Sequence, residues 1–267
     1  MEIIKIIFLG TIQGLTEFLP VSSSGHLILF QTWFQMNDSA MSLDIVLHFG
    51  TLFSVLLYYR SRIMVLIKKP FSRYNGLLIL TAIPAGIVGV FFSDYFRSIY
   101  EDARLLGPAF LVTALLLYLS SFDRTWFTRQ VMTEKTQENL SITDVLWIGL
   151  IQCLAIFPGV SRSGSTISAG LFRHINKEVA AELSFLNAII LILGANILEI
   201  PSLLQGNASL PLSHLLIGFL VSATTGYLAI SFMITMLKKR SLRPFAYYVA
   251  VLGIMVMLDG SFFHIIF

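Results

Sequence analysis

GTIQGLTEFLPVSSSG, residues 10–25, occurs a second time in altered form as GLIQCLAIFPGVSRSG, residues 149–164. The two segments align without a gap at an offset of 139 residues, and nine of their sixteen positions are identical. Unrelated segments of this composition would share about one or two identities. The chain therefore contains an internal duplication, and the polar part of the duplicated segment is the part that both copies share.

The differences between the two copies are also informative. The first copy carries Glu17, Ser23 and His26, whereas the second copy has Arg162 at the position that corresponds to Ser23. One copy supplies an acid, a hydroxyl and an imidazole, and the other supplies a fixed positive charge. This division of labour predicts that the two copies form two walls of one site.

The composition indicates an integral membrane protein. Hydrophobic residues make up 56% of the 267 residues and charged residues only 12%, about half the usual share of charged residues in a soluble domain. The mean hydropathy is +0.80. The net charge of +3 is small and argues against a nucleic-acid partner. Membrane lipids are the expected surroundings.

Six apolar stretches are predicted to span the membrane, and two segments are predicted to turn back inside it. The predicted spans cover about residues 43–59, 75–93, 105–121, 182–200, 212–237 and 245–267. The two repeat regions, about 1–35 and 143–175, each contain a Pro/Gly/Ser break between two short apolar runs. A broken backbone at membrane depth lines a cavity or is buried in protein, so each region is predicted to be a re-entrant helical hairpin.

The predicted fold is an all-α membrane domain with an inverted duplication. Residues 1–267 form one membrane domain, with a first repeat at about 1–121, a linker at about 122–141 and a second repeat at about 142–267. Each repeat has one hairpin and three transmembrane helices. Because three is odd, the second repeat begins on the opposite side of the membrane from the first, and the broken tips approach the midplane from opposite faces.

The distribution of basic residues predicts the orientation. Fourteen lysines and arginines fall on one predicted side, three on the other, and Arg162 lies inside. The fourteen are Arg60, Arg62, Lys68, Lys69, Arg73, Arg124, Arg129, Lys135, Arg173, Lys177, Lys238, Lys239, Arg240 and Arg243, and the three are Lys5, Arg97 and Arg104. The positive-inside rule makes the first side cytoplasmic. Both termini and the opening of the first hairpin are then outside.

A helix is predicted to begin after each break, with Ser22 and Ser161 as N-caps. Two such helix N-termini direct free N–H groups and positive dipole ends into one region. Arg162 adds a planar cation that suits phosphate or carboxylate. The alternative role for Arg162 is an ion pair with Glu17 that ties the two repeats together. Ser141 and Asp144 are also predicted to form a capping box where the second hairpin begins.

Glu17 and Gln13 are four residues apart, so a helix places both on one face. This carboxylate could act as a base, hold a cation or orient a neighbour. Ser23 and His26 are three residues apart, which is the spacing of a nucleophile beside its base. Asp44 and His48 also share a helix face and are interpreted as a local pair. The hydroxyls of Ser22, Ser24, Ser161, Ser163 and Thr166 are the candidate phosphate-binding donors.

At these residues the chain resembles the undecaprenyl-diphosphate phosphatases, also called the bacitracin-resistance family. The resemblance is carried by QGLTEFLPVSSSGH (residues 13–26) and PGVSRSGSTIS (residues 158–168). It is supported by IPAGIVG (residues 83–89), AAELSFL (residues 180–186) and PFAYY (residues 244–248). It extends over nearly the whole chain.

This resemblance implies hydrolysis of the terminal phosphate of a C55 isoprenyl diphosphate in the bacterial plasma membrane. The product is the carrier lipid that is reused in cell-wall synthesis, and the site opens toward the outer face. The resemblance places Glu17 in the acidic motif with Gln13, Ser23 and His26 in the chemistry, and Arg162 at the phosphates with Ser161 and Thr166. It also implies a divalent cation, Mg²⁺ or Ca²⁺, as a candidate cofactor.

The chain departs from the family pattern at three positions. Gln13 stands where some members have glutamate, Ile190 where a proline is expected, and Val249 where an arginine is expected. Only one carboxylate of the acidic motif is therefore available here.

A transporter is the alternative class, because inverted repeats with broken helices at the midplane are a transporter architecture. A carrier could move an anionic isoprenoid lipid with the same arginine. The set of Glu17, Ser23 and His26 favours chemistry, because binding an anion does not require a base. Nothing in the sequence indicates an oligomeric state.

Overall fold

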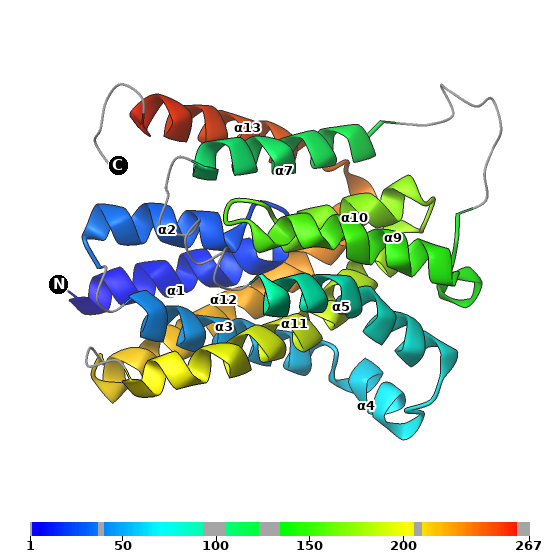
Figure 1. Ribbon diagram of the computed structural model, residues 1–267, viewed down its shortest axis with the longest axis horizontal. Coiled ribbons are helices and arrows are strands. Elements are labelled where there is room, and N and C mark those ends of the chain that lie inside the picture. The colour runs from blue at the N-terminus through cyan, green and yellow to red at the C-terminus, as the bar shows by residue number, and fades with distance from the viewer. Residues whose placement is uncertain (1, 37–39, 93–104, 123–133, 206–209, 261–267) are drawn as a thin grey trace.

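The computed structural model describes residues 2–36, 40–92, 105–122, 134–205 and 210–260. Within these ranges the chain is helical, apart from one isolated bridge between Lys135 and Ile175. Figure 1 shows most of the helices running along the long axis of the molecule. They are α1 (Glu2–Phe18), α2 (Ser23–Phe34), α3 (Ala40–Tyr58), α4 (Arg60–Lys68), α5 (Arg73–Phe91), α7 (Leu106–Ser120), α9 (Ile142–Gln152), α10 (Arg162–Phe172), α11 (Lys177–Gln205), α12 (Leu212–Lys239) and α13 (Arg243–Leu258), with short 3₁₀ turns η2 (Gln137–Asn139) and η3 (Cys153–Ile156).

Both repeat regions contain the predicted break. In the first, α1 ends at Phe18 and α2 begins at Ser23, and Ser22 accepts a hydrogen bond from the Gly25 N–H. In the second, α9 and η3 are followed by a turn that contains Gly159, whose φ is +94°. Ser161 then caps α10 by accepting from the Gly164 N–H. The two predicted N-caps are confirmed.

The capping box at the start of α9 is also confirmed. The Ser141 hydroxyl accepts from the Asp144 N–H, and the Asp144 carboxylate accepts from the Ser141 N–H. Asp144 is fully buried and additionally accepts hydrogen bonds from Lys135 and Arg173, each at 2.8 Å or less. A buried carboxylate requires such partners. The Lys135 contact attaches the start of α9 to the polar segment that precedes it, and the Arg173 contact attaches the start of α9 to the end of α10.

Within the described residues, four of the six predicted spans are long and apolar enough to cross a membrane. Three are single helices, within α5, α11 and α12, and the fourth is α3 taken together with α4. The other two, α7 and α13, are apolar helices of 15 and 16 residues. The predicted stretch 245–267 runs past α13 into residues outside the described ranges. The chain is thus a multi-pass membrane protein.

The segment 60–74, which lies between two of the predicted spans, contains the helix α4. This helix meets α3 at an angle of 77°. None of its residues is buried, and Met64, Val65 and Ile67 are exposed among arginines and lysines. A hydropathy pattern does not distinguish this helix from a polar connection, because its basic residues offset its apolar ones.

Glycines of the first hairpin allow α1 to approach α12 closely. A Cβ atom on Gly10 would lie 3.1 Å from the Gly218 carbonyl oxygen, and one on Gly14 would lie 2.6 Å from the Ser222 carbonyl oxygen. Small residues are the usual means by which membrane helices bring their backbones together. This contact fixes the height of α1, and therefore of Glu17 at its end, against the rest of the bundle.

Replacement of Gly14 by alanine is expected to destabilise the protein by about 1–3 kcal/mol, because a methyl group cannot fit without moving α1 away from α12. The check is the thermal unfolding midpoint of the purified variant in detergent. Gly86→Ala in α5 is the matched control, since a Cβ there meets nothing within 4 Å. Its midpoint should be unchanged or higher. Equal midpoints for the two variants would contradict this account of the α1–α12 contact.

Candidate active site

The broken tips of the two hairpins are in contact. Ser163 donates a hydrogen bond to the Leu19 carbonyl at 3.0 Å, across 144 residues of sequence. A Cβ on Gly25 would lie 3.1 Å from the Gly159 Cα. Ser22, in the first break, has φ of 72°, a region that a residue other than glycine rarely adopts. Such local strain persists where the surrounding structure enforces it, commonly at functional sites.

Glu17 lies at the centre of the contact between the tips and is only 8% exposed. One carboxylate oxygen, Oε2, accepts hydrogen bonds from the Ser23 hydroxyl at 2.6 Å and from the Gln13 amide at 3.2 Å. The other oxygen, Oε1, accepts from Arg162 Nη2 at 2.8 Å. The predicted shared face of Gln13 and Glu17 is confirmed. The carboxylate collects donors from α1, α2 and α10.

Arg162 joins the two hairpins to α11. Its Nη2 contacts Glu17, and its Nη1 donates to the Ser184 backbone carbonyl at 2.9 Å. The ion pair that was the alternative role for Arg162 is therefore present. A guanidinium has five N–H donors, so these contacts leave donors for a further acceptor. The Arg162 side chain is 15% exposed.

Ser23 and His26 do not form the predicted pair. Ser23 donates to Glu17, while His26 Nδ1 lies 2.7 Å from the Ser22 carbonyl and Nε2 lies 2.8 Å from the Tyr248 hydroxyl. Because a carbonyl can only accept, His26 Nδ1 carries a proton and Nε2 of the neutral ring is the acceptor. Ser23 is the first residue of α2, and its side chain turns back toward the break instead of along the helix face.

The predicted phosphate-binding hydroxyls cluster at the two helix starts. Ser22 and Ser24 lie 3.4 Å apart, and Ser161 and Ser163 lie 3.2 Å apart, measured between hydroxyl oxygens. Thr166, one turn along α10, lies 2.6 Å from the Ser184 hydroxyl. The structure thus brings the two serine pairs to corresponding positions in the two hairpins, with Thr166 on the side of α11.

Three residues near these groups did not stand out as site residues in the sequence. Ser184 contacts both Arg162 and Thr166, and Tyr248 stacks on His26 with ring centroids 5.8 Å apart. His48 Nε2 lies 4.0 Å from Glu17 Oε2. Ser184 and Tyr248 fall within AAELSFL and PFAYY, the stretches that support the family resemblance. Their roles depend on contacts between distant segments.

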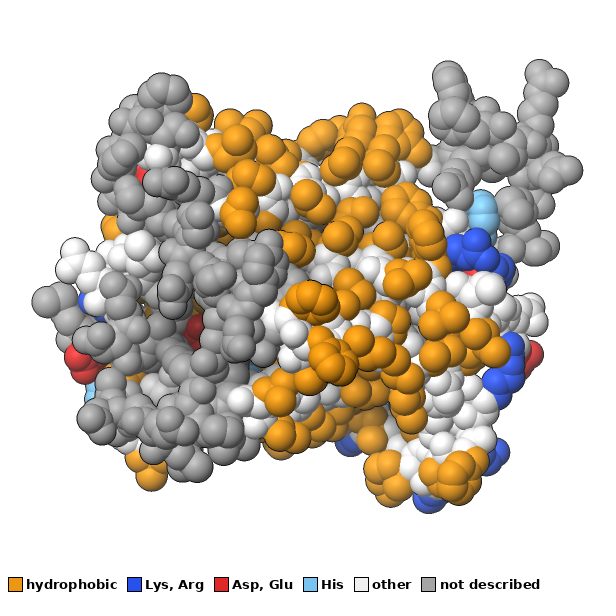
Figure 2. Space-filling model, viewed as in Figure 1, with side chains coloured by type: hydrophobic (Ala, Val, Ile, Leu, Met, Phe, Trp, Pro, Cys, Tyr) orange, Lys and Arg blue, Asp and Glu red, His pale blue; other side chains and the backbone are white. Residues whose placement is uncertain are grey.

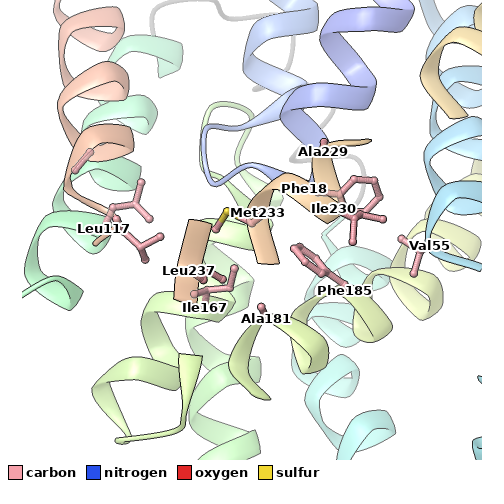
Figure 3. Close-up of a cluster of buried hydrophobic side chains, with 12 residues drawn as sticks. Phe18, Val55, Leu117, Ile167, Ala181, Phe185, Ala229, Ile230, Met233 and Leu237 are labelled. Atoms are coloured by element: carbon pink, nitrogen blue, oxygen red, sulfur yellow. The ribbon is translucent and has the colours of Figure 1, made fainter. Parts of the chain in front are cut away.

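A hydrophobic cluster packs α1, α10 and α11 together next to the site. Phe18, Ile167 and Phe185 each follow a site residue directly in the chain, and all three are fully buried. Figure 3 shows the Phe18 and Phe185 rings close together; they pack edge to face, with an interplanar angle of 88° and centroids 5.5 Å apart. Interiors are packed closely and resist deformation. Site residues therefore extend from three helices that are fixed against one another.

The side-chain oxygens of Glu17 and Gln13 are the candidate ligands for a cation at this site. The Gln13 Oε1 atom is buried and has no hydrogen-bond partner in the part of the chain that the structure describes. Among those residues, no three His, Cys, Asp or Glu side chains are close enough together to hold a metal ion. Mg²⁺ is typically held by one or two carboxylates together with substrate phosphates. The donors present fit that arrangement.

Position 249, where the family pattern predicts an arginine, is occupied by a fully buried valine. Val249 is part of α13, and it lies in one buried cluster with Leu106 and Phe110 of α7. This position contributes to the packing of α7 against α13.

Comparison with known protein families identifies the chain. A family model described as bacitracin resistance protein BacA matches residues 6–255. The chain belongs to this family. The matched region includes the second hairpin, all but the first residues of the first hairpin, and every site residue described above.

Curated relatives of the family cover almost all of the chain. An undecaprenyl-diphosphatase 4 of Bacillus cereus is 43% identical over 258 residues, which are 96% of this chain and 97% of the relative. Undecaprenyl-diphosphatases of Carboxydothermus hydrogenoformans and Halothermothrix orenii are each 39% identical, over 260 and 266 residues. They cover 96% and 98% of this chain and 97% and 100% of the relatives, respectively.

Proposed function

We propose that this protein hydrolyses undecaprenyl diphosphate to the monophosphate and inorganic phosphate, and thereby recycles the carrier lipid for cell-wall synthesis. The observation that carries the proposal is the group formed by the buried Glu17 and the partly buried Ser23 and Arg162 where the two broken helices meet. It combines a hydroxyl, a carboxylate that accepts its proton and a cation suited to phosphate. The names of the curated relatives indicate the same reaction.

Phosphate recognition is assigned to Arg162 and to the N-termini of α2 and α10. Both helices begin at the contact between the tips, where their positive dipole ends favour anions. The hydroxyls of Ser22, Ser24, Ser161, Ser163 and Thr166 add donors close to these ends. Arg162 then stabilises the negative charge that develops on the transferred phosphate.

Ser23 is assigned as the nucleophile. Its oxygen attacks the terminal phosphorus, its proton passes to Glu17, and the bond to the bridging oxygen breaks, which releases undecaprenyl monophosphate. Water then attacks the phosphoserine, with His26 Nε2 taking a proton from the water. The bond between phosphorus and the Ser23 oxygen breaks, this oxygen recovers its proton from Glu17, and inorganic phosphate leaves while His26 returns its proton to solvent. The Ser22 carbonyl holds His26 in the required tautomer. Direct attack by water, with Ser23 only as a ligand, is the competing mechanism.

A divalent cation is proposed as a cofactor at Gln13 and Glu17. The unpartnered Gln13 oxygen and the Glu17 carboxylate would hold it together with substrate oxygens. Bound there, Mg²⁺ or Ca²⁺ would neutralise charge on the diphosphate. Arg162 and the helix N-termini contribute to the same neutralisation without it.

The proposed architecture is a single membrane domain, residues 1–267, with inverted repeats at about 1–121 and 142–267 joined by the linker 122–141. Helix packing supports it, because α1 and α3 pack on α12, and α9 and α11 pack on α5. Helix α3 also contacts α11, and α7 packs on α13. Each hairpin thus contacts a helix of the other repeat. In Figure 1 the first hairpin extends inward from the left end and the second from the right end.

The proposed location is the bacterial plasma membrane, with both termini and the opening of the site outside. The basic residues support this orientation. Figure 2 shows hydrophobic side chains across the middle of the visible face and most of the visible lysines and arginines toward the right-hand end, where α4 lies. By the positive-inside rule that end is cytoplasmic.

Phosphate release by the purified protein in detergent tests the function. Undecaprenyl diphosphate should be converted to the monophosphate with release of inorganic phosphate, because chemistry requires no membrane compartments. A transporter of anionic isoprenoid lipid would release none under these conditions. The Ser23→Ala variant, prepared in the same way, controls for a contaminating phosphatase.

Labelling with an impermeant thiol reagent tests the orientation. Cys153 is the single cysteine, so it is first replaced by alanine, and one cysteine is then introduced at Glu2 or at Gln130. In intact cells the residue 2 variant is expected to label, and the residue 130 variant only after permeabilisation. Labelling of both from outside would contradict the inverted arrangement.

A further inference from the structure

Helix α4 connects two membrane-spanning helices and turns sharply away from the first of them. It begins at Arg60, just after the end of α3, and meets α3 at 77°. Helix α3 has 19 residues, which at 1.5 Å per residue extend over about 28 Å, close to the thickness of the hydrocarbon core. The next helix, α5, is itself long and apolar enough to cross. Helix α4 therefore lies where the chain leaves the membrane and enters it again, at a steep angle to α3.

One face of α4 is attached to the rest of the protein. Ile63 and Leu66 pack against the buried cluster that includes Leu183 of α11. Arg62 donates to the Glu182 carboxylate of α11 at 2.8 Å. These contacts hold α4 against the bundle, so its opposite face is presented in a defined orientation.

The turn that follows α4 is also ordered. The Asn75 side-chain amide donates to the Leu66 carbonyl at 2.9 Å and to the Lys69 carbonyl at 3.0 Å. Ser72 caps α5 by accepting from the Asn75 N–H. Phe71 belongs to this turn, and its side chain is fully exposed. The turn thus holds an aromatic ring outside the protein surface.

The outer face of α4 carries apolar and basic side chains side by side. Met64 and Ile67 are three residues apart, and both are more than half exposed. Arg60 and Lys68 lie one turn before and one turn after Met64, and both are exposed. Figure 2 shows hydrophobic side chains with lysine or arginine side chains beside them at the lower right, where α4 lies in Figure 1. Phe71 extends the apolar part beyond the end of the helix.

Three cations of this region form no ion pair within the part of the chain that the structure describes. They are Arg60, Lys68 and Lys69. Arg60 donates to the Leu57 backbone carbonyl, and its other donors remain available. Arg62, by contrast, is paired with Glu182. The three positive charges are therefore available to an anion outside the chain.

A phospholipid headgroup supplies both kinds of contact that this face requires. A helix with exposed apolar side chains between lysines and arginines is typical of the interface between lipid and water. Its apolar side chains enter the acyl region, while the long basic side chains extend to the phosphates. The position of α4 between the ends of two spans places it at this interface. Unpaired cations there favour anionic over zwitterionic headgroups.

We propose that α4 and the turn after it form a binding site for anionic phospholipid in the leaflet where α3 ends. Met64, Ile67 and Phe71 enter the acyl region, and the three unpaired cations contact the headgroup phosphates. The site is separate from Glu17 and Arg162. It does not depend on the phosphatase reaction, so it goes beyond the proposed function.

Lipid retention by the purified full-length protein tests the contribution of charge. The protein is equilibrated in detergent with equal amounts of phosphatidylglycerol and phosphatidylcholine, and the bound lipids are counted by native mass spectrometry. The wild type should retain phosphatidylglycerol over phosphatidylcholine by at least about fivefold. The triple variant Arg60→Gln, Lys68→Gln, Lys69→Gln should retain the two lipids almost equally.

The matched control removes three charges from the end of α12. The triple variant Lys238→Gln, Lys239→Gln, Arg240→Gln should keep the preference of the wild type. An α4 variant with the wild-type preference would overturn the proposal. An equal loss in the α12 variant would also overturn it, because net charge and not α4 would then set the preference.

The depth of α4 in a bilayer tests the apolar contribution. In a Cys153→Ala background, a spin label is attached at Ile67→Cys or, for comparison, at Glu138→Cys in the exposed turn η2. In vesicles of phosphatidylcholine and phosphatidylglycerol, the label at residue 67 should collide more with oxygen than with a water-soluble nickel chelate. The label at residue 138 should show the reverse. Equal access of the chelate to both positions would place α4 in water, where a soluble partner would cover it, and would refute the lipid site.

Discussion

Arg162→Lys is expected to lose about 10²–10³-fold in kcat/KM, although the positive charge is kept. The guanidinium reaches Glu17 with Nη2 and the Ser184 carbonyl with Nη1, and it retains donors for phosphate. A lysine ammonium is a point charge on a flexible stem, and it cannot hold both protein contacts and a phosphate in one plane. The measurement is turnover of undecaprenyl diphosphate by purified protein in detergent.

The matched control is Arg240→Lys, an exposed arginine just after α12, which should keep full activity. Thermal unfolding of both variants shows whether the loss reflects chemistry or folding. Near wild-type turnover in Arg162→Lys would mean that Arg162 serves only as the ion-pair partner that ties the hairpins together.

Ser23→Ala is expected to reduce turnover by at least about 10³-fold while binding of the diphosphate lipid is retained. In the proposed mechanism the hydroxyl is the nucleophile, whereas Arg162 and the helix N-termini hold the phosphates. Because Ser23 donates to Glu17 at 2.6 Å, the two act as a unit. The double variant with Glu17→Gln should therefore be hardly worse than Ser23→Ala alone. Turnover and lipid affinity are measured for both single variants and the double.

His26 belongs to the same comparison. If it serves the second step, His26→Ala should be nearly inactive, and adding it to Ser23→Ala should change little. Thr11→Ala, on the exposed face of α1, is the control for substitution of a hydroxyl. Substantial turnover in Ser23→Ala would exclude the serine mechanism and leave water as the nucleophile, activated by Glu17 or His26.

Local features of the structure were predictable because their causes are local. The Ser22 and Ser161 caps, the Ser141–Asp144 capping box and the shared face of Gln13 and Glu17 depend on atoms within four residues of one another. The duplication also predicted that the two breaks would meet at one site. The helix α4 was not predicted, because its basic residues lower the average hydropathy of a segment that also has an apolar surface.

The sequence alone determined the membrane class, the two breaks in the repeat regions and the family, and it supplied the candidate site residues. Only the tertiary structure decided which partner each of these residues has. Ser23 pairs with Glu17, His26 with Tyr248, and Arg162 with both Glu17 and Ser184. The contact of Arg162 with Glu17 spans 145 residues and that of His26 with Tyr248 spans 222. Helix spacing places residues on a face, but which faces meet depends on close packing, such as that of Gly14 on α12, and on side-chain directions at helix ends.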